Sequence, residues 1–124
     1  MLTESLITEH TDLSKSIFIG YSGGPDSTAL VHLLSILNAR QELNLKAIHI
    51  NHNLSKYSSI WENHCVETCS KLNVNLITKS IEIKVDGGGL ESASRKARYR
   101  VFEKILTRDD QLLLGHHIDD VAET

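Results

Sequence analysis

The sequence has few cysteines, no excess of positive charge and no long hydrophobic run. Cys65 and Cys69 are its only cysteines, too few for a disulfide scaffold and too close for an easy bridge within one helix, so we expect a reducing compartment. The net charge of −3 excludes a module that binds nucleic acid by bulk charge. The longest uncharged stretch on a helical pattern, Ser27 to Ala39, has 13 residues and cannot span a membrane. No secretory signal is visible, and we expect a cytoplasmic protein without a membrane segment.

The composition is that of a globular chain. Its 124 residues are 40% hydrophobic and 23% charged, which allows one domain with a real core. The sequence stops at Thr124, one or two turns into a helix expected from His117 onward. We therefore expect residues 1–124 to form a single domain and to be a fragment of a longer protein.

Strand-like and helix-like segments alternate along the chain. The predicted strands are Lys15 to Tyr21, Leu45 to Asn51, Val74 to Ile83 and Gln111 to Gly115, and the predicted helices are Asp26 to Arg40, Ser58 to Leu72 and Leu90 to Leu106. Short connections between such segments predict an α/β fold, a parallel sheet with helices on both faces. The fourth strand is expected to lie next to the first.

A glycine-rich loop, Ser22-Gly23-Gly24-Pro25-Asp26-Ser27, separates the first predicted strand from its helix. Two glycines let the backbone approach an anion, and the helix N-terminus behind them adds unpaired N–H groups and partial positive charge. Ser22 and Ser27 supply hydroxyl donors, while Asp26 can cap the helix or hold a divalent cation. Neither the Walker pattern nor the dinucleotide fingerprint fits, yet the loop is suited to phosphate.

The loop resembles the SGGxDS signature of the PP-loop ATP pyrophosphatases, which cleave ATP between its α- and β-phosphates. Three further blocks, His49 to Ser55, Leu90 to Tyr99 and Gly115 to Thr124, occur in the order and spacing of the tRNA(Ile)-lysidine synthases. The resemblance runs from about Lys15 to Thr124. It departs from the family where Asn53 stands in place of glycine and Ser55 in place of arginine.

The resemblance implies a Rossmann-like PP-loop domain that uses ATP and Mg²⁺ to attach free L-lysine to C2 of the wobble cytidine of tRNA(Ile) with a CAU anticodon. A homodimer is one assembly that it allows. The implied nucleotide-binding residues are Ser22, Gly23, Gly24, Pro25, Asp26, Ser27, His49 and Asn51, with Asp26 also the metal ligand. The implied catalytic residues are Asp26, His117, Asp120 and Glu123, and the implied substrate-binding residues are Arg95, Arg98, Asp119, Asp120 and Glu123.

Each of these features has a plainer explanation. Acidic residues near His117 could simply stabilise a helix start. Cys65 and Cys69 beside His64 could suggest a metal site, but buried helix cysteines fit better. On the long helix we expect Leu90, Ala93, Ala97, Val101 and Ile105 to form the buried stripe and Lys96 to be solvated. Two other functions stay open: another PP-loop enzyme, such as a tRNA-thiolating one, whose C-x-x-C pair is absent here, and a nucleotide-binding module without catalysis.

Overall fold

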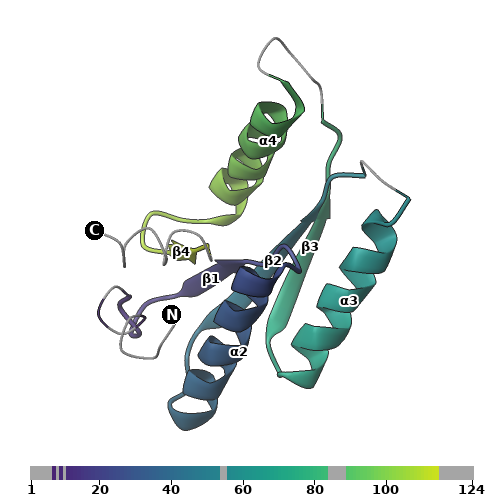
Figure 1. Ribbon diagram of the computed structural model, residues 1–124. Coiled ribbons are helices and arrows are strands. Elements are labelled where there is room, and N and C mark those ends of the chain that lie inside the picture. The colour runs from purple at the N-terminus through teal and green to yellow at the C-terminus, as the bar shows by residue number, and fades with distance from the viewer. Residues whose placement is uncertain (1–6, 8, 10, 54–55, 84–88, 115–124) are drawn as a thin grey trace.

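The computed structural model describes residues 7, 9, 11–53, 56–83 and 89–114 (Figure 1). Strands and helices alternate as predicted: β1 (Ile17–Gly20), α2 (Pro25–Arg40), β2 (Leu45–Asn51), α3 (Ser58–Lys71), β3 (Asn75–Ser80), α4 (Gly89–Ile105) and β4 (Gln111–Leu113). The bounds predicted for β2 are confirmed, whereas β1, β3 and β4 are shorter than predicted. Within the described residues, no helix combines the length and the apolar character needed to cross a membrane.

The four strands form one sheet in the order β3-β2-β1-β4, and every neighbouring pair is parallel. Gly20 of β1 lies opposite Ile48 of β2, and Ile19 of β1 lies opposite Leu113 of β4. The predicted neighbourhood of the first and fourth strands is therefore confirmed.

Helices cover both faces of the sheet, with α2 and α3 on one face and α4 on the other (Figure 1). Because side chains alternate along a strand, β1 contributes to two cores. Ile17 and Ile19 belong to a buried cluster with Leu30 and Leu34 of α2. Phe18 belongs to a second cluster, which includes Phe102 of α4.

The buried stripe of α4 differs from the prediction. Leu90 is 48% exposed, whereas Phe102, which was left out of the predicted stripe, is 5% exposed and packs in the second cluster. Ala93 is buried as expected, and Val101 and Ile105 are half-buried. The helix is oriented so that its largest apolar side chain, Phe102, is buried against the sheet, which buries the most apolar area. The spacing of apolar residues alone does not predict this orientation.

The order of the strands fixes where a ligand can bind. After β1 the chain moves through β2 to β3 on one side, and then returns by α4 on the opposite face to place β4 on the other side of β1. A crevice forms at such a reversal, beyond the carboxyl ends of the two strands. The glycine-rich segment lies at this edge, directly after β1.

Candidate functional site

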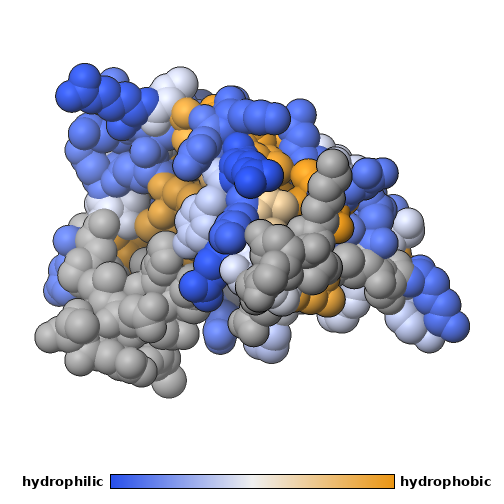
Figure 2. All heavy atoms as spheres, turned by 90° about the horizontal axis from the view of Figure 1, so that it is seen from above, coloured by the Kyte–Doolittle hydropathy of each residue, from blue (hydrophilic) through white to orange (hydrophobic). Residues whose placement is uncertain are grey.

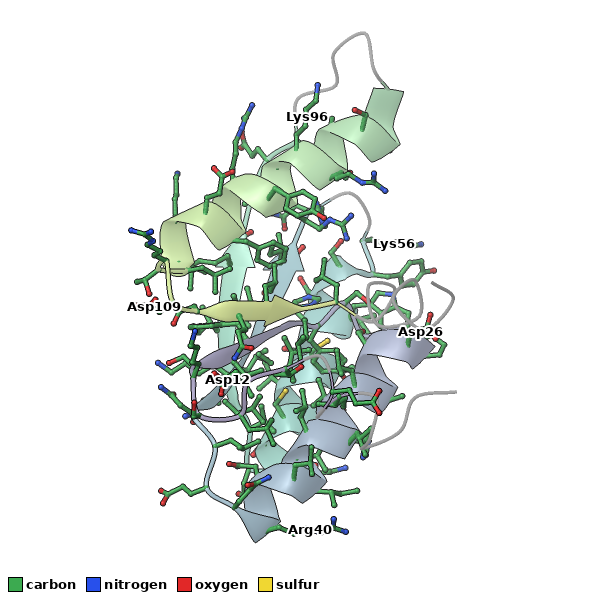
Figure 3. The ribbon with its side chains drawn as sticks, turned by 90° about the vertical axis from the view of Figure 1, so that its left-hand side faces the viewer. Asp12, Asp26, Arg40, Lys56, Lys96 and Asp109 are labelled. Atoms are coloured by element: carbon green, nitrogen blue, oxygen red, sulfur yellow. The ribbon has the colours of Figure 1, made fainter. Side chains whose placement is uncertain are left out.

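The phosphate loop (residues 22–27) connects β1 to α2. The Tyr21 N–H still donates to the Ile48 carbonyl at 2.8 Å, so the sheet holds the backbone up to the residue before the loop. Helix α2 then begins with Gly24 as its N-cap and Pro25 as its first residue. Asp26 is thus in the first turn and does not occupy the capping position, so the capping role expected for Asp26 is wrong. A carboxylate in the first turn still stabilises the positive end of the helix dipole. Figure 3 shows Asp26 at this end of α2 and Arg40 at the other.

Two serine hydroxyls fix the shape of the loop from within. The Ser22 N–H donates to the Ser27 Oγ at 3.2 Å, and the two hydroxyl oxygens lie 3.0 Å apart. The Gly24 N–H donates to the Ser22 Oγ at 3.2 Å. Ser27 is buried whereas Ser22 and Asp26 are exposed, so Ser27 serves the conformation of the loop and the other two can meet a ligand.

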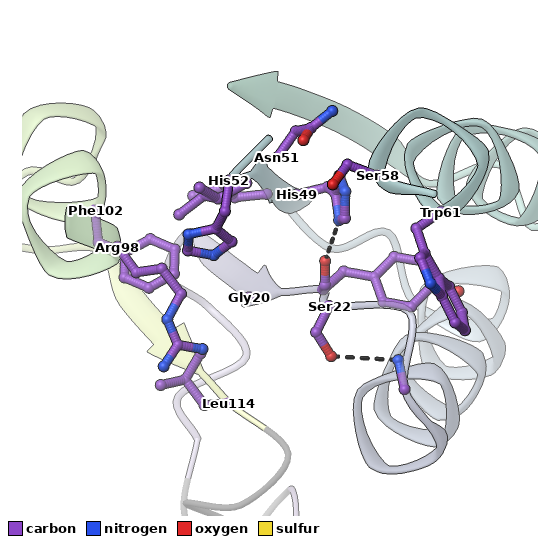
Figure 4. A pocket seen from close by; sticks show the side chains of 14 residues that line it. Gly20, Ser22, His49, Asn51, His52, Ser58, Trp61, Arg98, Phe102 and Leu114 are labelled. Atoms are coloured by element: carbon purple, nitrogen blue, oxygen red, sulfur yellow. Dashed lines mark hydrogen bonds between the residues drawn. The ribbon is translucent and has the colours of Figure 1, made fainter. Parts of the chain in front are cut away.

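A cavity of about 440 Å³, the main cavity, opens beside the loop (Figure 4). Its size is within the usual range for small-molecule sites, roughly 300–1,000 Å³. A second cavity of about 180 Å³, the side cavity, is lined by the loop itself. Gly20, Ser22, Gly24, Arg98 and Leu114 line both cavities, which makes them parts of one site. From above, apolar surface shows between polar side chains on the molecule (Figure 2).

His49 and Asn51, both predicted to bind nucleotide, lie at the end of β2 and line the main cavity. The His49 Nδ1 lies 2.9 Å from the Tyr21 carbonyl oxygen, and since a carbonyl can only accept, Nδ1 is the donor of this hydrogen bond. The Asn51 Oδ1 accepts the Asn53 N–H at 2.9 Å. Asn53 has φ +55°, a left-handed conformation that asparagine tolerates, so the turn survives where the family has glycine.

His52, the residue after β2, and Arg98 of α4 both line the main cavity and lie on the same side of it (Figure 4). The His52 Nδ1 is buried and has no hydrogen-bond partner among the described residues. Burial, together with the nearby Arg98 and His49, lowers the pKa of His52, so its ring is a neutral acceptor near neutral pH. The cavity therefore offers a guanidinium to a ligand, with a neutral imidazole ring beside it.

The structure separates the two arginines that the sequence grouped together. Arg98 is half-buried and lines both cavities, whereas Arg95 is exposed and lines neither of them. Lys96 is exposed, as expected, and points away from the sheet (Figure 3). His117, Asp119, Asp120 and Glu123 lie outside the described residues.

The two cysteines are buried and free, as the sequence predicts. Burial, with smaller contributions from Cys69 and Glu62, raises the pKa of the Cys65 thiol to about 12, and burial raises that of Cys69 to about 11. Both thiols are therefore protonated at neutral pH, and a protonated thiol is a weak nucleophile. Within the described ranges, no cluster of three or more His, Cys, Asp or Glu side chains could hold a metal ion.

Sequence reasoning missed several residues of the site. Trp61 of α3, Phe102 of α4 and Leu114 after β4 all line the main cavity. Only Trp61 carried a signal, as the single tryptophan of the chain near the start of a predicted helix. The others reach the cavity through packing between elements that are distant in sequence.

Curated tRNA(Ile)-lysidine synthases are among the proteins to which the chain is similar. That of Alkalilimnicola ehrlichii is 43% identical over 107 residues, which are 86% of this chain and 24% of the relative. That of Legionella pneumophila (strain Paris) is 43% identical over 110 residues, 89% of this chain and 25% of the relative. That of Enterobacter sp. (strain 638) is 35% identical over 124 residues, which are 99% of this chain and 29% of the relative. The chain spans about a quarter of the length of these relatives.

Two further comparisons concern the fold and the family. The solved structure of the U34-tRNA thiolase NcsA from Methanococcus maripaludis, with its 4Fe-4S cluster, matches with a TM-score of 0.63 and 24% identity, over 95% of this chain and 44% of that chain. This likeness concerns the fold alone. A family model described as the PP-loop domain matches residues 3–124. The glycine-rich loop lies at the reversal point of a parallel sheet, and the family model matches nearly the whole of this chain. The chain therefore belongs to the ATP-binding PP-loop domain family.

Proposed function

We propose that this chain is the ATP-binding part of a tRNA(Ile)-lysidine synthase. The observation that carries the proposal is that five residues line both the side cavity at the phosphate loop and the larger main cavity, which has room for a nucleoside. The names of the similar proteins support a tRNA(Ile) substrate. Free lysine as the second substrate and the cytoplasm as the site of action are parts of the same proposal.

The reaction has two steps. ATP activates the C2 carbonyl oxygen of the wobble cytidine as an adenylate and releases pyrophosphate. The ε-amine of lysine then attacks C2 and releases AMP, and the modified tRNA reads AUA in place of AUG. In this proposal the phosphate loop and Asp26 bind the triphosphate, and His49 and Asn51 bind the nucleoside. Arg95 contacts the tRNA, whereas Arg98, which lines both cavities, meets the ATP. Asp119, Asp120 and Glu123 serve lysine and its proton, and His117 meets a phosphate or adenylate oxygen.

Mg²⁺ fits the residues at the loop. Mg²⁺ is usually held by one or two carboxylates together with substrate phosphates and water, so the exposed carboxylate of Asp26 beside the hydroxyl of Ser22 suffices. A dedicated protein cage is not required. When bound, the ion neutralises charge on the phosphates as pyrophosphate leaves.

A thiolating PP-loop enzyme is the second candidate, and the cysteines argue against it. Cys65 and Cys69 are buried on one helix, and the raised pKa of each thiol leaves it protonated at neutral pH. A thiolation chemistry that uses an exposed cysteine pair has no such pair in the part of the chain that the structure describes.

The test follows pyrophosphate release and incorporation of labelled lysine in separate assays. We expect both only when the purified protein receives MgATP, lysine and tRNA(Ile) with a CAU anticodon, and we expect pyrophosphate release to persist without lysine. A tRNA transcript with uridine at the wobble position is the matched control and should support neither. ATP binding without any tRNA-dependent turnover would contradict the proposal and favour a catalytically silent nucleotide-binding module.

A further inference from the structure

Gly23 of the phosphate loop is pressed against helix α3. Its φ is +90°, and an added Cβ would lie 3.2 Å from the Cys65 Sγ, 3.2 Å from Trp61 Cε3 and 3.6 Å from Trp61 Cζ3. The first two distances are tighter than ordinary van der Waals contact. The backbone of the loop therefore packs on one ring and one thiol, with no room for a side chain between them.

Trp61 and Cys65 can act together because they are four residues apart on one face of α3. Cys65 is fully buried in the core cluster of α2 and α3, so it anchors this part of the helix to the sheet. Its Sγ also lies 3.5 Å from the Nδ1 of His49, which contacts the Tyr21 carbonyl just before the loop. The loop is thus supported by α3 as well as by its own serines.

Trp61 also belongs to the binding site. Its ring is 52% exposed and lines the main cavity, while its six-membered edge meets Gly23 (Figure 4). A loop that binds phosphate through backbone N–H groups must keep those groups aimed at the ligand before it arrives. Without a neighbour on the α3 side, a left-handed glycine has many accessible conformations, and binding has to order it.

We propose that Trp61 is a positioning residue that holds Gly23, and with it the phosphate loop, in the conformation that binds the polyphosphate of ATP. This inference rests on the proposed function, because it presupposes that the loop binds ATP. In this role Trp61 acts on ATP binding by holding the phosphate loop, which is distinct from stacking on the base of the nucleotide.

The first test compares ATP and inorganic pyrophosphate as ligands of Trp61→Leu by calorimetry. We expect both affinities to fall by the same factor, about tenfold, because both ligands use the loop. Trp61→Phe keeps an aromatic ring and should stay within about threefold of the wild type. The matched control is Ile60→Ala, which removes a 63% exposed side chain from the neighbouring position of α3 and should change neither affinity.

Three results would overturn the inference. An affinity for ATP that falls while that for pyrophosphate does not would make Trp61 a base-stacking residue. Unchanged affinities with a lowered melting temperature would make it purely structural. Failure of the wild-type protein to bind ATP at all would instead contradict the proposed function.

A second measurement needs no substitution. Trp61 is the only tryptophan, so the intrinsic fluorescence of the wild-type protein reports on its surroundings. We expect pyrophosphate, which uses the loop and not the nucleoside space, to change the emission as it saturates the loop. An emission that saturating pyrophosphate leaves unchanged would contradict the inference.

Discussion

Gly23 and Gly24 have different roles, although they are adjacent in the loop. Gly23 needs its left-handed φ and its contact with α3, so any side chain there strains the fold. Gly24 has an ordinary φ of −75°, and an added Cβ would meet the Ser22 Oγ at 3.4 Å. A substitution at Gly24 therefore changes the surface that a phosphate approaches and leaves the backbone conformation available.

We predict that Gly24→Val and Asp26→Ala each weaken ATP binding by at least about tenfold without unfolding the protein. Valine blocks the approach of the phosphate, and alanine removes the carboxylate suited to Mg²⁺. Calorimetry with MgATP and a thermal melt provide the two readouts. Asp109→Ala, which removes an exposed carboxylate at the far end of the molecule (Figure 3), should bind ATP normally. Unchanged affinity in both loop variants would exclude the loop as the phosphate site.

His52 makes the stability of the protein sensitive to pH. Burial, then Arg98 and His49, hold its pKa below the usual 6.5, so the folded state disfavours the charged ring. As the pH falls below about 6.5, the unfolded chain binds a proton that the folded one resists, and the free energy of unfolding decreases. We predict that the free energy of unfolding, measured with urea, falls less between pH 7.5 and 5.5 in His52→Gln than in the wild type. His32→Gln, at an exposed position of α2, serves as the control, and an identical pH dependence in His52→Gln and wild type would contradict the prediction.

At the scale of elements, α4 presents two arginines to two different environments. Arg98 precedes Phe102 by four residues, so the two side chains lie on the same side of the helix. Phe102 is buried against the sheet, and Arg98 lines the cavities. Arg95 is exposed. The family resemblance implied that both arginines bind the substrate, but only Arg95 lies away from the two cavities that we assign to ATP.

We therefore predict that Arg98→Glu weakens ATP binding by about tenfold, because a carboxylate beside the phosphate loop repels the polyphosphate. Arg95→Glu should leave ATP affinity unchanged and lower tRNA affinity, with a smaller dependence on salt because one phosphate contact is lost. Calorimetry measures the first effect and tRNA binding at several salt concentrations measures the second. Equal ATP affinities for the two variants would show that the cavity does not receive the nucleotide.

The elements show what the sequence could predict and what it could not. Periodicity and turn residues located every helix and strand from β1 to β4, and the bounds of β2 were correct, because those signals are local. The helical residues Ile7 and Glu9 were not predicted. The same reasoning placed Leu90 in the core and missed Phe102, since a helical wheel does not say which apolar side chain meets the sheet. In the site, the loop was predictable because its residues are contiguous, whereas Trp61 and Leu114 reach it through tertiary packing.

At the scale of the whole molecule, the pairing of β4 with β1 is the feature that joins two parts of the proposed reaction. The phosphate loop follows β1, and β4 ends beside it, with Ile19 opposite Leu113. Leu114 also contacts the position that a side chain at Gly20 would occupy. The chain after β4 carries Asp119, Asp120 and Glu123, which lie outside the described residues. The topology therefore places the end of β4, after which the sequence that we assign to lysine follows in the chain, at the edge of the sheet that we assign to ATP.

This arrangement predicts that the two steps of the reaction can be separated by substitution. The ammonium group of lysine must be bound and deprotonated beside the adenylate, which requires carboxylates. In the full-length protein, Asp120→Asn or Glu123→Gln should raise the apparent KM for lysine by about an order of magnitude or more while adenylate formation on the tRNA persists. Losing a hydrogen bond to a charged group costs roughly 1.5–3 kcal/mol, which corresponds to a change of this size.

The measurement again follows pyrophosphate release and lysine incorporation separately, at several lysine concentrations. Asp26→Ala is the informative comparison, because loss of a loop ligand should reduce both steps together. A selective loss of lysine incorporation in the Asp120 and Glu123 variants would place the amine site after β4. If pyrophosphate release falls in parallel instead, these carboxylates serve ATP or its metal ion, and lysine must bind elsewhere along the carboxyl edge of the sheet.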